Sequence, residues 1–90
     1  MTKKPTLPEL RKAIDDADDI ILKALAARLH AVAFLGNIKR ETGVPVENPE
    51  REAELKARWK KKAEELGITP ELALLLLDFL ILESKRIQNS

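Results

Sequence analysis

The stretch TLPELRKAIDDADDIILKALAARLHAVAFLGNIKRET, from Thr6 to Thr42, decides the fold. Thr6 and Glu9 have the spacing of a capping box, and Pro8 falls in the first helical turn, where proline is tolerated. No further proline follows in the stretch. Its one glycine, Gly36, weakens a helix by only about 1 kcal/mol relative to alanine. The stretch therefore predicts one uninterrupted helix.

One side of this predicted helix is apolar but is interrupted by charges. Ten residues, spaced alternately by three and four positions, fall on that side, and six of them are apolar, which is typical of a helix that faces a core. The ten are Leu7, Arg11, Ile14, Asp18, Ile21, Leu25, Arg28, Val32, Leu35 and Lys39. Isolated charges are costly to bury, so the four charged members point to ion pairs or to a ligand.

The composition indicates a single small all-α domain over residues 1–90, with residues 1–5 as a disordered tail. Glycine is scarce and β-branched runs are few, which favours helices. Cysteine is absent, which excludes disulfides and, together with the lack of a signal peptide, favours a cytoplasmic protein. The net charge of only +1 gives no support for a general nucleic-acid or membrane-surface role.

Two shorter helices are predicted after the long one. Gly43 is placed to end the long helix, because glycine readily adopts the left-handed conformation of a C-terminal cap. Asn48 and Thr69 are each followed by proline, a pair typical of an N-cap and the first helical position. These signals predict helices over residues 49–66 and 70–88.

The length of the first helix predicts a second chain. About 36 helical residues extend about 54 Å, whereas a compact domain of this size has a radius of gyration near 12 Å. Two shorter helices cannot cover such a length. We therefore expect a second copy to cover the apolar side in a two-fold dimer with interlocked helices.

The charged and polar seam residues suit an anionic ligand. Arg28 and Lys39 share a helical face about 16 Å apart, while Arg11 lies about 25 Å from Arg28 and can reach the same place only from a partner chain. The pooled set is Arg11, Arg28, Lys39, Arg51, Glu52, Ser84 and Gln88. Guanidinium groups match carboxylates, which favours a compact dicarboxylate. Spacing alone leaves the other interpretation open, that these charges set register or pair with each other.

Other reactive residues do not form a recognisable site. His30 lies about 160° round the helix from Arg28 and has no second histidine or cysteine beside it in the pattern, so we predict no metal site. Trp59 is interpreted as a packing anchor. Ser84 has no histidine near it on its helix, so a nucleophilic triad has no support.

Five segments of the chain, in order and with matching spacing, resemble the all-helical chorismate mutases (the AroQ class). The segments are Leu10–Asp15, Ala26–Arg28, Gly36–Lys39, Asn48–Glu52 and Glu83–Gln88. Each is short, but together they extend over three predicted helices. The resemblance therefore favours a ligand site over purely structural ion pairs.

The resemblance implies a chorismate mutase of aromatic amino acid biosynthesis, active without a cofactor as a domain-swapped homodimer. Arg11 would reach the site from the partner chain and bind one carboxylate of chorismate, and Arg28 would bind the other from within the chain. Lys39 and Gln88 would hydrogen-bond the ether oxygen. Prearranged donors at that oxygen stabilise the charge that grows there as chorismate rearranges to prephenate.

The remaining roles also follow from the resemblance. Glu52 would take the ring hydroxyl, Arg51 would support carboxylate binding, and Ser84 would help with a carboxylate. Asn48 stands where the family often has Asp, and it can still accept a hydrogen bond from the ring hydroxyl, but without charge.

Two alternatives to the mutase stay open. An isochorismate–pyruvate lyase would use the same fold and a similar cationic pocket, and Ser84 and the loop at residues 43–47 favour the mutase only weakly. A catalytically silent dimerisation or regulatory module would keep the fold alone. The retained Lys39 and Gln88, with both arginines, argue against that module because it has no need for buried cations.

Overall fold

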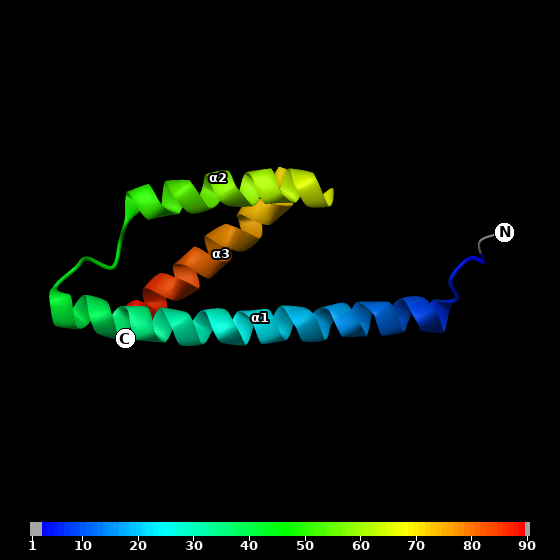
Figure 1. Ribbon diagram of the computed structural model, residues 1–90, viewed down its shortest axis with the longest axis horizontal. Helices are drawn as coiled ribbons and strands as arrows, with labels where there is room; N and C mark the ends of the chain where they lie inside the picture. Colours follow the sequence, from blue (N-terminus) through cyan, green and yellow to red (C-terminus); the bar gives the residue numbers. More distant parts are fainter. Residues whose placement is uncertain (1–2, 90) are drawn as a thin grey trace. The chain divides into compact units, whose positions relative to one another are not determined.

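The computed structural model describes residues 3–89, which contain three α-helices and no strand (Figure 1). The helices are α1 (Leu7–Thr42), α2 (Pro49–Leu66) and α3 (Pro70–Gln88). The predicted all-α fold of one long and two shorter helices is confirmed. Residues 1 and 2 of the predicted tail lie outside the described residues, and residues 3–6 precede α1 without helical structure.

The ends of α1 lie where the sequence signals place them. The backbone N–H of Glu9 donates to Thr6 Oγ1 at 3.3 Å, which satisfies one of the free donors of the first turn. At the other end Gly43 has φ of +74°, a left-handed conformation that favours glycine. The long helix therefore needs no tertiary contact to define where it starts and stops.

The starts of α2 and α3 look alike in the sequence but differ in the structure. Asn48 Oδ1 accepts a hydrogen bond from the backbone N–H of Arg51 at 3.1 Å, as predicted for an N-cap. Thr69 stands at the N-cap position of α3, but its side chain makes no capping hydrogen bond, so that part of the prediction is wrong. The first turn there rests on the backbone bond from Ala73 N–H to Thr69 O, 3.2 Å, and on proline at the first helical position.

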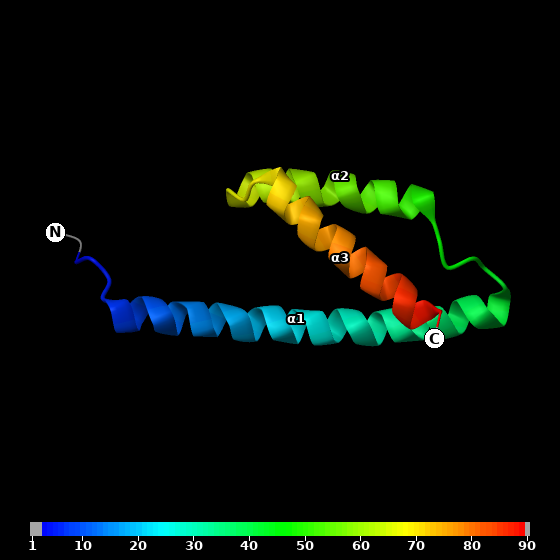
Figure 2. The same cartoon turned by 180° about the vertical axis from the view of Figure 1, so that it is seen from behind.

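The chain divides into two compact units within α1, one ending at Ala31 and the other starting at Val32. The second unit holds the last turns of α1 with α2 and α3. In this unit α2 packs against α3, and the C-terminal end of α3 reaches the last turns of α1, as both views show (Figures 1 and 2). Leu77 is fully buried, and Ala63 and Ala73 are buried with it, so a small aliphatic core holds α2 and α3.

The first unit is a single stretch of helix with its apolar side chains exposed. Leu7, Ile14 and Ile21, all on the predicted seam, are each 60% exposed, and no side chain between residues 3 and 31 is fully buried. Despite this apolar surface, no helix within residues 3–89 has the length and apolar character required to span a membrane.

Candidate active site

Gly36 and Gln88 join the end of α3 to α1. Gly36 is buried, and a Cβ at this position would lie 3.3 Å from the Cγ of Gln88. Arg40 Nη1 donates to the backbone carbonyl of Gln88 at 2.9 Å and fixes the same junction. The sequence pattern treated Gly36 only as a weak point of the helix, whereas the structure uses its missing side chain for a close approach.

Gln88 presents a buried amide at this junction. The residue is 6% exposed, and its Nε2 donates to Ser84 O at 3.1 Å. Its Oε1 is buried and has no hydrogen-bond partner among the described residues. A buried polar atom in this condition costs free energy. The amide therefore has one N–H and one oxygen available to a bound molecule.

Lys39 lies on α1 and Ser84 on α3, the two helices that meet where Gly36 approaches Gln88. Lys39 is half-buried on α1, three residues after Gly36, and its Nζ donates to the backbone carbonyl of Val46 at 3.2 Å. Ser84 is half-buried on α3, where its Oγ donates to Leu80 O at 2.7 Å. The loop before α2 is thus tied to the α1 segment that meets α3.

Glu52 has a partner that the sequence pattern did not identify. Lys85 Nζ lies 3.1 Å from Glu52 Oε1 and 3.3 Å from Glu47 Oε1, so that one ammonium on α3 joins α2 and the loop before it. The hydrogen bond with Glu52 is the main reason why the pKa of Lys85 is raised above its ordinary value. The helical spacing does not single out Lys85, because its partners are more than thirty residues away in the sequence.

Four predicted site residues therefore lie on segments of the second unit that the Gly36–Gln88 and Lys85–Glu52 contacts join. They are Lys39, Glu52, Ser84 and Gln88. Two others of this unit are placed differently. Asn48 is exposed and serves as the N-cap of α2, and the Arg51 side chain is 54% exposed and pairs with Glu54 on the same helix.

The two arginines predicted to bind carboxylates belong to the first unit. Arg11 is exposed. Arg28 is half-buried, and this burial lowers the pKa of its guanidinium from the ordinary value.

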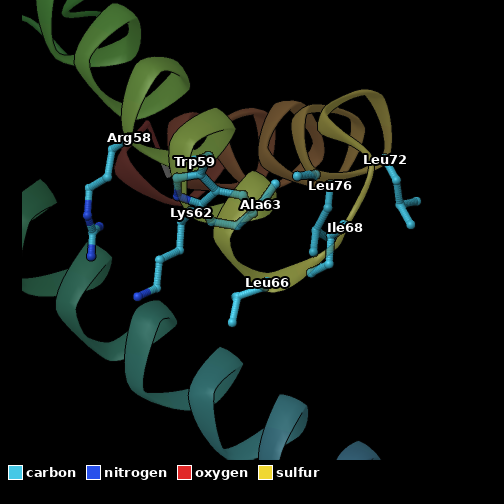
Figure 3. Close-up of a pocket in the computed structure, with 9 residues that line it drawn as sticks. Arg58, Trp59, Lys62, Ala63, Leu66, Ile68, Leu72 and Leu76 are labelled. Carbon is cyan, nitrogen blue, oxygen red and sulfur yellow. The ribbon is translucent and has the colours of Figure 1, made fainter.

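A separate apolar groove lies at the other end of α2 and α3 (Figure 3). Its volume is about 560 Å³, and apolar side chains from both helices and from the turn between them form most of its lining, with Arg58 and Lys62 from α2 at its edge. Leu66 and Leu72 in this lining are 63% and 60% exposed. None of the predicted site residues lines this groove, so it is not the predicted site for a small anion.

Comparison with known proteins identifies the family of this helical chain. Residues 10–89, which include every predicted site residue, match the family described as chorismate mutase type II. The chain belongs to this family. The resemblance inferred from the sequence motifs is thereby confirmed.

Individual relatives of this chorismate mutase family differ in length. The chain is 33% identical over 83 residues to "Chorismate mutase" of Methanocaldococcus jannaschii, covering 92% of the chain and 84% of that protein. It is 41% identical over 83 residues to "T-protein" of Enterobacter agglomerans, covering 92% of the chain but 22% of that protein. It is 34% identical over 83 residues to "4-amino-4-deoxychorismate mutase" of Streptomyces pristinaespiralis, covering 92% of the chain and 64% of that protein. No solved structure matches the chain.

The chain thus spans about a fifth of the T-protein and most of the Methanocaldococcus jannaschii chorismate mutase. In this chain the chorismate mutase type II match, residues 10–89, runs through α1, α2 and α3.

Proposed function

We propose that this chain catalyses the rearrangement of chorismate to prephenate, a step of aromatic amino acid biosynthesis. The observation that carries the proposal is the family match over residues 10–89, within which Lys39, Glu52, Ser84 and Gln88 gather on contacting segments. A cytoplasmic location, predicted from the composition, is part of the same proposal.

The ether oxygen of chorismate is the atom whose developing charge the site would stabilise. Negative charge grows there as the C–O bond breaks, and donors already in position stabilise it more in the transition state than in the ground state. Lys39 Nζ and the free N–H of Gln88 Nε2 are the proposed donors. Lys39 Nζ donates to Val46 O in the structure. On substrate binding it would leave this carbonyl and donate to the ether oxygen.

The two carboxylates of chorismate need cations that fix the substrate in a compact geometry. Arg28 would bind one carboxylate from within the chain, and Arg11 of a second copy would bind the other, with Ser84 as a further hydrogen-bond donor. Arg51 would support carboxylate binding and the electrostatics of the pocket, although it now pairs with Glu54 on its own helix. Holding a flexible substrate in a reactive conformation accounts for a large share of the barrier in such a reaction.

The ring hydroxyl would donate a hydrogen bond to Glu52. Asn48 is the second proposed acceptor, although its Oδ1 already accepts from the Arg51 N–H. We expect Glu52 to carry most of this interaction, because a carboxylate oxygen accepts a stronger hydrogen bond than an amide oxygen.

The active unit is proposed to be an intertwined homodimer. Exposed apolar residues support this proposal, both on the α1 seam (Leu7, Ile14, Ile21) and in the groove beside α2 (Leu66, Leu72). Exposed apolar patches of this extent are typical of surfaces that another chain covers. Sedimentation equilibrium measures the oligomeric state directly, and a monomer at all concentrations contradicts the proposal.

The reaction is tested by incubating the purified protein separately with chorismate, isochorismate and 4-amino-4-deoxychorismate. Loss of chorismate with appearance of prephenate supports the mutase. Salicylate and pyruvate from isochorismate alone indicate the lyase, and turnover of the amino compound alone indicates the activity after which the Streptomyces relative is named. No turnover of any of the three indicates a silent module.

The shared site is tested by mixing two inactive variants. Arg11→Ala and Arg28→Ala homodimers should each lack activity, because both of their sites miss one arginine. After subunit exchange, a mixed dimer has one site with both arginines and one site with neither. Recovered activity supports Arg11 acting from the partner, and no recovery despite verified exchange contradicts it.

A further inference from the structure

Lys85 is a cation of the second unit whose ion pairs join three segments of the chain. Its ammonium lies 3.1 Å from Glu52 and 3.3 Å from Glu47, so it links α3 with α2 and with the loop before α2. By contrast, the ion pairs Lys12–Asp16 and Arg86–Glu83 each join residues three or four apart on one helix. Only a link between elements can fix the position of one element relative to another.

The pair of Lys85 with Glu52 is also partly shielded from water. Their side chains are 28% and 23% exposed, whereas Glu47 is 73% exposed. Charge pairs shielded in this way are stronger than exposed ones. The Glu52 contact is therefore the principal one, and Glu47 adds a weaker contact from the solvent side.

The position of Lys85 places it among the proposed site residues. It follows Ser84 directly on α3 and lies three residues before Gln88. Its contact atom on Glu52 is Oε1, which leaves Oε2 as the oxygen that can accept a hydrogen bond from a bound hydroxyl. A carboxylate held by one oxygen presents the other in a fixed direction.

The charge of Glu52 gives this contact a further role at a site for a dianionic ligand. An uncompensated Glu52 carboxylate beside the site would repel the two carboxylates of the substrate, since like charges at short range in a shielded site are strongly unfavourable. Lys85 removes that repulsion and leaves the hydrogen-bonding oxygen in place.

We propose that Lys85 is a positioning residue that fixes the Glu52 carboxylate and offsets its charge, so that Glu52 can bind the substrate hydroxyl without repelling a dianion. This inference rests on the proposed function. Lys85 does not act at the ether oxygen, so its effect is the same in the ground state and in the transition state. Its loss should therefore raise KM and leave kcat nearly unchanged.

The test is a double-mutant cycle on the chain of residues 1–90 with chorismate as substrate. Lys85→Met should raise KM about tenfold and change kcat less than about threefold, the size expected for one charge-assisted interaction. Lys85→Arg should restore most of the loss. In the Glu52→Gln background, adding Lys85→Met should change KM less than about twofold, because no carboxylate is left to offset.

Controls separate this role from a structural one. Arg86→Met removes the neighbouring exposed cation on α3, and Glu47→Gln removes the solvent-side partner; both should leave KM within about twofold. Circular dichroism and thermal unfolding check each variant. If Lys85→Met does not fold, Lys85→Gln, which keeps a hydrogen-bond donor but no charge, takes its place in the cycle.

The outcomes are distinct. If the unaltered protein does not convert chorismate, the proposed function fails. If it does, an unchanged KM in the Lys85 variants overturns the positioning role. The positioning role is also overturned if Lys85→Met raises KM equally in the unaltered protein and in the Glu52→Gln variant. Lys85 would then act without Glu52.

Discussion

Gly36 and Gln88 approach so closely that a Cβ built on Gly36 would lie 3.2 Å from the Cα of Gln88. Few side-chain carbons tolerate such a distance to backbone, so any residue other than glycine must push the end of α3 away. The same residue pair holds α3, which carries Ser84, Lys85 and Gln88, against the α1 segment that carries Lys39.

Gly36→Ala should therefore lower activity while it changes the stability of the fold only slightly. Alanine favours the helix by about 1 kcal/mol, which opposes the cost of moving Gln88 by a few tenths of an ångström, so the free energy of unfolding should change by less than about 1 kcal/mol. A shift of the Gln88 amide should lower kcat/KM by about tenfold. Steady-state kinetics and urea unfolding measure the two quantities.

Ala33→Gly is the matched control for this substitution. Ala33 is exposed on the same helix, so its replacement changes helix propensity without crowding α3. It should cost about 1 kcal/mol of stability and leave kcat/KM within about twofold. If Gly36→Ala and Ala33→Gly alter activity equally, the close approach has no functional importance.

Gln88→Leu should lower activity strongly without destabilising the protein. Gln88 is 6% exposed and its Oε1 has no partner among the described residues, so an apolar side chain of similar size should leave the free energy of unfolding unchanged or raise it by about 1 kcal/mol. Loss of one donor at the ether oxygen should lower kcat by about a hundredfold or more. Activity within threefold of the unaltered protein, a margin of about 0.6 kcal/mol, would exclude Gln88 as that donor.

The helices were predictable because residues close to each helix end determine where the helix begins and ends. Thr6, Gly43 and Asn48 each act within four residues of their own position, and the structure places all three as expected. Thr69 is the exception, because an N-cap residue type permits a capping hydrogen bond but does not require one.

Contacts between distant segments were not predictable from the pattern. The role of Gly36 depends on its close approach to Gln88 on α3, and the role of Lys85 depends on its ion pair with Glu52 on α2. Helical spacing could place Lys39 and Arg28 on the seam, but it gave no means of identifying which partner each would meet. The roles of Arg11 and Arg28 toward a substrate stay predictions, to be decided by the mixed-dimer experiment.

The two N-cap positions offer a direct comparison of sequence signal and structure. Asn48→Ala should lower the free energy of unfolding by about 1 kcal/mol, because it removes the 3.1 Å bond from the Arg51 N–H. Thr69→Ala should cost only a few tenths of a kcal/mol, since no such bond is present. Urea unfolding at one fixed protein concentration makes the comparison. Equal losses would contradict the structural difference between the two caps.

The contribution of Lys85 to stability should persist far into the alkaline range. Its hydrogen bond with Glu52 raises the pKa of the folded state above that of the unfolded state, so the stabilisation is complete below the ordinary lysine pKa of about 10.4 and is lost as the pH rises through the folded pKa. The difference in unfolding free energy between the unaltered protein and Lys85→Met should stay constant from about pH 7 to 9 and shrink above about pH 10.4. Arg86→Met is the control, because a guanidinium keeps its proton throughout this range and its difference should not shrink. A Lys85→Met difference that declines already between about pH 7 and 9 would show that the Lys85–Glu52 pair does not raise this pKa in solution.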